Sequence, residues 1–123
     1  MDKPDFKLVV AGGRLFNDYK TLSKYLDYML CKKVETHNIV IVCGEAKGAD
    51  ALGKEYAIER GYRVISMPAD WDLYGKSAGY RRNEAMAACS DATVAFWDGE
   101  SKGTSHMIAL TKDYGNKLSV VRY

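Results

Sequence analysis

Short apolar runs alternate with longer amphipathic segments along the chain. The apolar runs are rich in Val, Ile and Ala and contain little charge, as do strands that are buried on both faces of a sheet. Between them, apolar residues recur at intervals of three and four residues, which predicts helices. The expected strands are Phe6–Ala11, Ile39–Cys43, Tyr62–Met67, Thr93–Trp97 and Leu118–Arg122. The first expected helix begins at Asp18. The other three cover Ala49–Arg60, Gly79–Cys89 and Ser105–Tyr114.

This alternation of strand and helix predicts an α/β fold built on a parallel sheet. Because crossovers between parallel strands are right-handed, few topologies remain. We expect a Rossmann-like three-layer sandwich, in which a five-stranded parallel sheet of order 3-2-1-4-5 carries helices on both faces. The length of 123 residues predicts a single domain over residues 1–123. One long loop, from Pro68 to Ala78, is expected to be structureless and functional.

Most glycines lie in the four segments that connect a strand to the following helix. In an open parallel sheet these segments meet at the carboxyl edge, where ligands bind. Glycine lets the backbone approach a ligand closely, while helix N-termini and basic side chains attract anions. The four segments are Gly12–Arg14, Gly44–Gly48, Gly75–Gly79 and Gly99–Gly103, and each carries a basic residue. The pattern predicts a site for the phosphate groups of a nucleotide or dinucleotide.

The side chains around these segments suit such a ligand. Arginine can bind two phosphate oxygens at once, and an aromatic ring can stack on a base. Surface ion pairs, helix caps and a packed lid are the structural alternatives; Asp50, for example, could cap a helix or accept a hydrogen bond from a ribose hydroxyl. The candidate ligand-binding residues are Gly12, Gly13, Arg14, Gly44, Lys47, Gly48, Asp50, Trp71, Lys76, Arg81, Arg82, Asn83, Asp98, Gly99, Gly103, Thr104, Ser105 and His106.

Composition narrows the classes of partner. The net charge is only +2 and no basic-aromatic groove pattern is present, which argues against a nucleic-acid partner. No apolar stretch is long enough to span a bilayer, and the first residues show no signal-peptide pattern. The three widely spaced cysteines predict reduced thiols in a cytoplasmic protein. We expect no metal, because His106 has no second histidine or cysteine nearby. We also expect no cofactor.

The aromatic content adds a prediction about assembly. Nine tyrosines and two tryptophans are more aromatic surface than a core of this size readily hides. We therefore expect a homo-oligomer, at least a dimer.

Five ordered motifs resemble the YspA-like branch of the SLOG superfamily. They are Gly12–Arg14, Gly44–Asp50, Pro68–Trp71, Arg82–Asn83 and the stretch from Phe96 to His106. The resemblance implies a Rossmann-like fold that binds nucleotides or nucleotide-derived ligands, in bacteria or their phages. It also implies a protein that senses or sequesters a signal derived from NAD or ADP-ribose, in defence or counter-defence.

The same superfamily contains the Lonely Guy phosphoribohydrolases, which cleave the N-glycosidic bond of nucleoside monophosphates. Arg82–Met86, Ser90–Ala92 and Gly103–Thr104 resemble parts of their pattern, but Met107 occupies the position of their catalytic glutamate. A thioether cannot act as a general base. The resemblance therefore favours a nucleotide-binding protein.

Enzymatic activity nevertheless stays open at this point. A nucleotide hydrolase is the alternative function, with an acidic residue near the glycine-rich segments as acid or base: Glu45, Asp70, Asp72 or Asp98. A third function, binding of single-stranded DNA as in DNA-processing protein A, is disfavoured by the small net charge.

Overall fold

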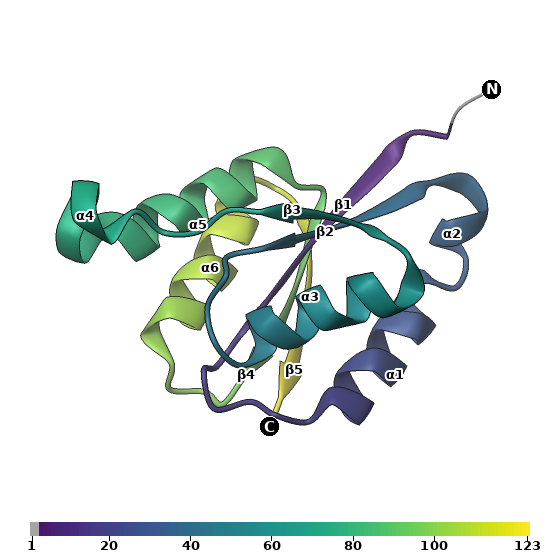
Figure 1. Cartoon of the computed structure of the whole chain (residues 1–123), viewed down its shortest axis with the longest axis horizontal. Coiled ribbons are helices and arrows are strands. Elements are labelled where there is room, and N and C mark those ends of the chain that lie inside the picture. Colours follow the sequence, from purple (N-terminus) through teal and green to yellow (C-terminus); the bar gives the residue numbers. More distant parts are fainter. Residues whose placement is uncertain (1–2) are drawn as a thin grey trace.

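The computed structural model describes residues 3–123, in which strands and helices alternate (Figure 1). The strands are β1 Asp5–Gly12, β2 Asn38–Cys43, β3 Arg63–Ser66, β4 Ala92–Trp97 and β5 Lys117–Arg122. The helices are α1 Tyr19–Leu30, α2 Lys33–Thr36, α3 Ala49–Arg60, α4 Trp71–Tyr74, α5 Ala78–Cys89 and α6 Lys102–Asp113, with a 3-10 turn η1 at Gly75–Ser77. All strand pairs are parallel, in the order β3-β2-β1-β4-β5. The predicted α/β fold and strand order are confirmed.

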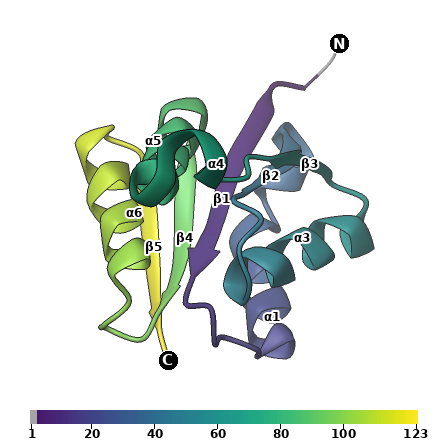
Figure 2. The same ribbon diagram turned by 60° about the vertical axis from the view of Figure 1, so that its left-hand side comes forward.

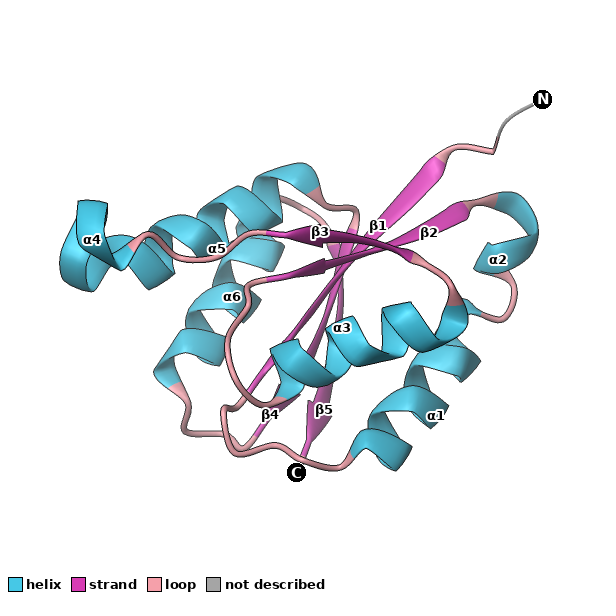
Figure 3. Cartoon of the chain, in the orientation of Figure 1, coloured by secondary structure: helices cyan, strands magenta, loops and turns pink. Residues whose placement is uncertain are grey.

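Two pairs of helices cover the two faces of the sheet (Figures 2 and 3). Side chains alternate between the faces along each strand. In β1, Leu8 and Val10 face α1 and α3, where they belong to the same buried cluster as Leu26. Val9 and Ala11 face α5 and α6, which contribute Met86 and Met107 to a second cluster. Burial on both faces explains why these strands are continuous apolar runs.

The segment from Pro68 to Ala78 differs from its expectation. It is not structureless, because α4 and η1 form within it. The Asp70 side chain caps α4 by accepting a hydrogen bond from the Leu73 N–H at 3.1 Å. Helix α2 was also not predicted. Among residues 3–123, no helix is both long and apolar enough to cross a membrane.

The last helix begins earlier than expected, at Lys102 and not at Ser105. Asp98 Oδ1 accepts the N–H groups of Glu100 at 2.9 Å and Ser101 at 2.8 Å, and this turn directs the chain into α6. Gly103 therefore lies in the first helical turn and not in the preceding loop.

The strand order creates a crevice at the carboxyl edge of the sheet. From β1 the chain adds β2 and β3 on one side, then returns to place β4 and β5 on the other. The segments that follow β1 and β4 lead to helices on opposite faces, so they diverge where these neighbouring strands end. Open sheets of this kind bind ligands at such a switch point.

Candidate functional site

A pocket of about 360 Å³ opens at the switch point between β1 and β4. Its floor is formed by Ala11, Met86 and Met107, which belong to the apolar cluster between the sheet and helices α5 and α6. Its walls come from the segments after β1, β2, β4 and β5 and from the first turns of α5 and α6. A pocket of this volume with a few convergent polar groups is typical of small-molecule sites.

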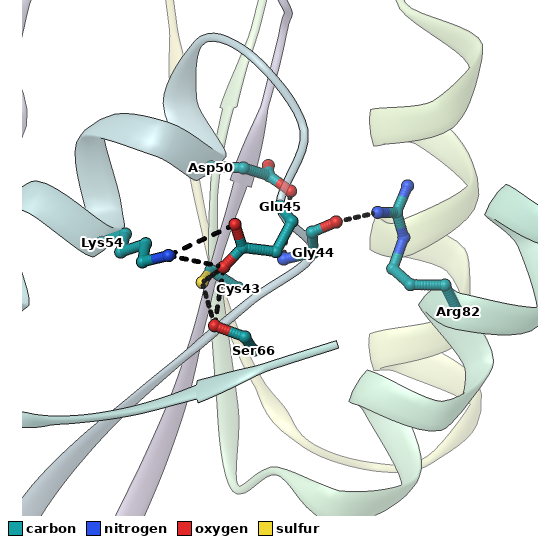
Figure 4. A network of polar contacts seen from close by, with 7 residues as sticks. All are labelled: Cys43, Gly44, Glu45, Asp50, Lys54, Ser66 and Arg82. Carbon is teal, nitrogen blue, oxygen red and sulfur yellow. Dashed lines mark hydrogen bonds and ion pairs between the residues drawn. The ribbon is translucent and has the colours of Figure 1, made fainter. Parts of the chain in front are cut away.

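Arg82, in the second turn of α5, lines the pocket, and its guanidinium points toward Gly44 in the loop after β2 (Figure 4). Its half-buried guanidinium donates one hydrogen bond to the Gly44 carbonyl and another, through Nε, to Asn83 Oδ1 at 2.9 Å. Burial lowers the pKa of Arg82, the nearby Arg14 acts in the same direction, and Asp50 opposes both. Among residues 3–123, neither arginine has a carboxylate oxygen within 4.0 Å. Two neighbouring guanidiniums without a close counter-charge favour an anion between them.

Asp50 is a buried carboxyl group in the wall of the same pocket. Its Oδ2 accepts the Gly44 N–H at 3.2 Å. Burial raises the pKa of Asp50 to about 6, although Arg82 and the N–H groups of Gly44 and Ala46 favour the charged form. The alternative that Asp50 caps the second long helix is wrong, because Gly48 is the N-cap residue of α3. A contact between Asp50 and a ribose hydroxyl stays a prediction.

A second polar network holds the loop between β2 and α3 on the side opposite Arg82 (Figure 4). Glu45 has a left-handed backbone, with φ of +60°. Its carboxylate accepts hydrogen bonds from Ser66 Oγ at 2.6 Å and Lys54 Nζ at 3.1 Å. The Ser66 hydroxyl and then Lys54 lower the pKa of Glu45, so this group is a poor general acid. The loop is therefore fixed by side chains that do not line the pocket between β1 and β4.

The start of α6 forms the opposite wall. The buried Thr104 lines the pocket, and its hydroxyl lies 3.1 Å from that of Ser101. Asn83 Nδ2 donates to the Gly103 carbonyl at 3.3 Å, which connects α5 to this turn. The first N–H groups of a helix have no partner within it and carry the positive end of the helix dipole. This wall can therefore donate hydrogen bonds to an anion.

Half of the predicted site residues line this pocket together. They are Gly12, Gly13, Arg14, Asp50, Arg82, Asn83, Asp98, Gly103 and Thr104. A second pocket of about 300 Å³ adjoins the first, with which it shares Arg14, Ala46 and Arg82. Three more predicted residues line this second pocket: Gly44, Lys47 and Trp71.

The remaining predicted residues lie elsewhere. Gly99, Ser105 and His106 line a separate hollow beside α6, where the His106 ring packs edge-on to Tyr80 at 4.5 Å. Arg81 stacks over the Tyr74 ring at 4.4 Å, and neither Arg81 nor Lys76 lines the two adjoining pockets. Gly48 has φ of +79° and packs so tightly on the Gly13 carbonyl that a side chain would not fit.

Seven further residues line the pocket and were not among the predicted ones: Ala11, Leu15, Ala46, Met86, Ser101, Met107 and Tyr123. The Tyr123 hydroxyl lies so close to Gly13 that a Cβ there would overlap it. Tyr123 directly follows β5, and the carboxyl ends of parallel strands meet at one edge. Its position after the last strand was thus a usable signal, whereas the exposed Leu15 gave none.

Residues 6–74 match the model of the YspA, cpYpsA-related SLOG family, which is more than half of the chain. The chain belongs to this family. A curated relative, the gene 61 protein of Mycobacterium phage D29, is 33% identical over 106 residues, which cover 81% of this chain and 83% of that protein. The predicted membership of the SLOG superfamily is confirmed.

Two solved structures of DNA processing protein A share the fold of this SLOG-family chain. The Streptococcus pneumoniae protein has a TM-score of 0.70 and 17% identity, over 95% of this chain and 50% of that one. The Helicobacter pylori protein, which has a described single-stranded DNA binding mode, has a TM-score of 0.66 and 22% identity, over 95% of this chain and 65% of that one. The chain thus spans between half and two thirds of these proteins.

The second of these structures corrects one expectation. We predicted from the net charge of +2 that a nucleic-acid partner is disfavoured. This argument from net charge is wrong, because a protein with a single-stranded DNA binding mode shares the fold. Net charge averages over the whole surface, whereas here Arg14, Lys47 and Arg82 gather along one edge of the sheet. The predicted homo-oligomer stays a prediction.

Proposed function

We propose that this SLOG-family chain binds a nucleotide-derived ligand through its phosphate groups, in the pocket between β1 and β4. The observation that carries the proposal is the pair of guanidiniums of Arg14 and Arg82, which face this pocket without a close carboxylate in residues 3–123. The first turn of α6 adds backbone donors on the opposite side. These features suit an anion with several oxygens.

The ligand that we favour is a signal derived from NAD or ADP-ribose, which the protein senses or sequesters. Family membership supports a nucleotide-derived ligand, and the phage relative is consistent with a role in defence or counter-defence. Binding is favoured over hydrolysis because three of the four acidic candidates are otherwise engaged. Glu45 is paired with Lys54, Asp70 caps α4, and Asp98 holds the turn before α6.

Single-stranded DNA is a second candidate ligand. The two adjoining pockets place Arg14, Lys47 and Arg82 near the exposed Trp71, and proteins that bind single strands combine basic grooves with aromatic rings. The Helicobacter pylori protein of the same fold supports this candidate.

The test compares the full chain with the variant Arg82→Ala. Calorimetry with ADP-ribose, NAD, AMP and an oligothymidylate identifies the ligand, and a thermal-shift screen checks that it stabilises the fold. Loss of a charge-assisted hydrogen bond to phosphate should weaken binding by about 1.5–3 kcal/mol, roughly ten- to a hundredfold. The control is Arg63→Ala, which removes the exposed ion pair between Arg63 on the edge strand β3 and Asp5. This variant should leave the affinity unchanged.

Arg82 also holds the Gly44 carbonyl, so Arg14→Ala serves as a second variant without this structural contact. The Arg14 side chain is exposed, so its removal should weaken binding of the same ligand without lowering the melting temperature. If no compound shifts the melting temperature at millimolar concentration, the proposed function is wrong. Release of ribose phosphate from any of them would show an enzyme instead.

A further inference from the structure

The side chain of Asn83, which follows Arg82 in α5, connects the pocket to a ring outside it. Asn83 Oδ1 accepts the Nε–H of Arg82 at 2.9 Å. Asn83 Nδ2 lies 3.3 Å from the Gly103 carbonyl and 3.2 Å from Nδ1 of His106. Asn83 is buried and lines the pocket between β1 and β4, whereas His106 lines the separate hollow beside α6. One buried amide therefore contacts residues of both cavities.

The partners of Asn83 fix the orientation of its amide. A guanidinium only donates hydrogen bonds, so the atom that faces Arg82 is the amide oxygen. A backbone carbonyl only accepts them, so the atom that faces Gly103 is the amide nitrogen. The same nitrogen donates its other hydrogen to Nδ1 of His106, which requires a lone pair on Nδ1. The contact therefore selects the neutral imidazole with its proton on Nε2.

We propose that His106 is a positioning residue of the anion site, which holds the Arg82 guanidinium in place through the side chain of Asn83. The inference rests on the proposed function where it concerns a ligand, and it goes beyond that function by giving a role to a residue outside the pocket. The second anchor of Arg82 is the Gly44 carbonyl (Figure 4). Within residues 3–123 the Nη2 group of Arg82 makes no hydrogen bond, which leaves this group for phosphate.

Protonation of His106 would disrupt this arrangement. It would place an N–H on Nδ1, directly opposite the N–H of Asn83. Turning the amide over would not relieve this contact, because its oxygen would then face the Gly103 carbonyl and its nitrogen would face Arg82 Nε. Burial lowers the pKa of His106 below its usual 6.5, although Glu84 opposes the shift. The ring is therefore neutral at pH 7 and gains a proton only in more acidic solution.

The groups around the His106 ring come from several elements. The Tyr80 ring of α5 packs edge-on against it at 4.5 Å. Glu84 of α5 is the charged residue that affects the pKa of His106. The hollow also contains Glu100 and Lys102 beside the start of α6, and the Trp97 ring on which Arg122 of β5 stacks. In the pocket, Asp50 titrates at about 6, so a pH experiment has to separate it from His106.

NMR spectroscopy without a ligand tests the connection. The Nε–H resonance of Arg82 is assigned as the one that Arg82→Lys removes. Asp50→Asn serves as the background, because it removes the other group that titrates near pH 6 beside Arg82. Between pH 7 and 5, the Arg82 resonance should shift with the same midpoint as the ring signals of His106. His106→Leu should abolish this titration.

Calorimetry with ADP-ribose at pH 7 measures the effect on binding. His106→Leu removes the acceptor for Asn83 and should weaken binding about three- to tenfold. His106→Asn should restore most of the affinity, because its amide oxygen can take the place of Nδ1. The matched control is His37→Leu at the only other histidine, which precedes β2 and lies at the amino edge of the sheet. This variant should leave the affinity unchanged, and melting temperatures show that each variant is folded.

A double-mutant cycle separates positioning from direct contact. If His106 acts through Asn83, His106→Leu should cause no further loss of affinity in the variant Asn83→Ala. Additive losses would mean that His106 touches the ligand itself, and would overturn the inference. An Arg82 resonance that does not follow the titration of His106 would overturn it as well, as would equal affinities of His106→Leu and His106→Asn. Failure of ADP-ribose to bind the unmodified chain would count against the favoured ligand, whereas the ligand-free spectra would still decide on the role of His106.

Discussion

The interior of the sheet and its carboxyl edge differ in what they bury. In the interior, Leu8, Val10 and Leu26 are fully shielded from solvent and need no polar partner. At the edge, Asp50 and Asn83 are nearly as deeply buried but make hydrogen bonds to loops and to other site residues. Burial of apolar groups stabilises the fold, whereas burial of a carboxyl group costs stability unless it is compensated. The buried apolar residues of the interior thus stabilise the fold, whereas the buried polar residues at the edge form the candidate site.

The largest expected effect on stability lies in the interior. Leu26→Ala removes a fully buried side chain from α1 and leaves a cavity against the sheet. We expect the free energy of unfolding in urea to fall by about 2–5 kcal/mol. Ligand affinity of the remaining folded protein should be unchanged, because α1 contributes nothing to the pocket. A large loss of affinity at a temperature where the variant is folded would contradict this division between the interior and the candidate site.

At the edge, Asp50→Asn should change how stability depends on pH. Burial raises the pKa of Asp50 from 3.8 to about 6 in the folded chain. The folded form holds the proton more tightly, so this contribution to stability is full below pH 4 and is lost as the pH rises through 6. With 1.36 kcal/mol per pKa unit, the original chain should lose about 2–3 kcal/mol relative to the variant between pH 4 and 7.

Urea denaturation of both proteins at several pH values measures this difference. Asparagine keeps an acceptor for the Gly44 N–H but carries no charge, so its own curve should lack this dependence. Parallel curves would mean that folding does not change the pKa of Asp50.

The smallest expected effect comes from the network behind the loop. Glu45→Ala removes a partly exposed ion pair with Lys54 and the hydrogen bond from Ser66, and it keeps a side chain at φ of +60°. We expect a loss of about 1–2 kcal/mol in stability. Glu45→Gly removes the same contacts but tolerates the left-handed backbone, so it should be about 1 kcal/mol more stable than the alanine variant. Equal stability of the two would show that the backbone there is unstrained.

Most of the fold followed from local signals in the sequence. Strands such as Ile39–Cys43 are short, β-branched and free of charge, and Gly61 ends α3 with φ of +74°. Segments with mixed signals failed. Trp71–Tyr74 forms a single helical turn that periodicity cannot register, although Asp70 before it is a typical cap. The start of α6 was placed too late in the sequence, because Gly103 lies in its first turn and glycine is uncommon inside helices.

The site was predicted in outline because its main residues follow the ends of strands. Arg14 and Asp98 come directly after β1 and β4, so topology alone brings them together. The sequence could not reveal that Arg82 donates to the Gly44 carbonyl, 38 residues away, or that two pockets meet at this arginine. Such contacts depend on the packing of α5 against the segment after β2, which no local pattern encodes.

The position of α4 at the far end of α5 has a consequence for the history of such chains (Figure 1). This short helix buries no residue of its own, yet it begins with Trp71 at the second pocket. Its sequence can drift, or a whole segment can be exchanged, without reopening the core, while Arg14 and Arg82 remain anchored on the scaffold. A lineage under pressure to recognise a changing chemical signal could thus renew its selectivity through a handful of surface residues.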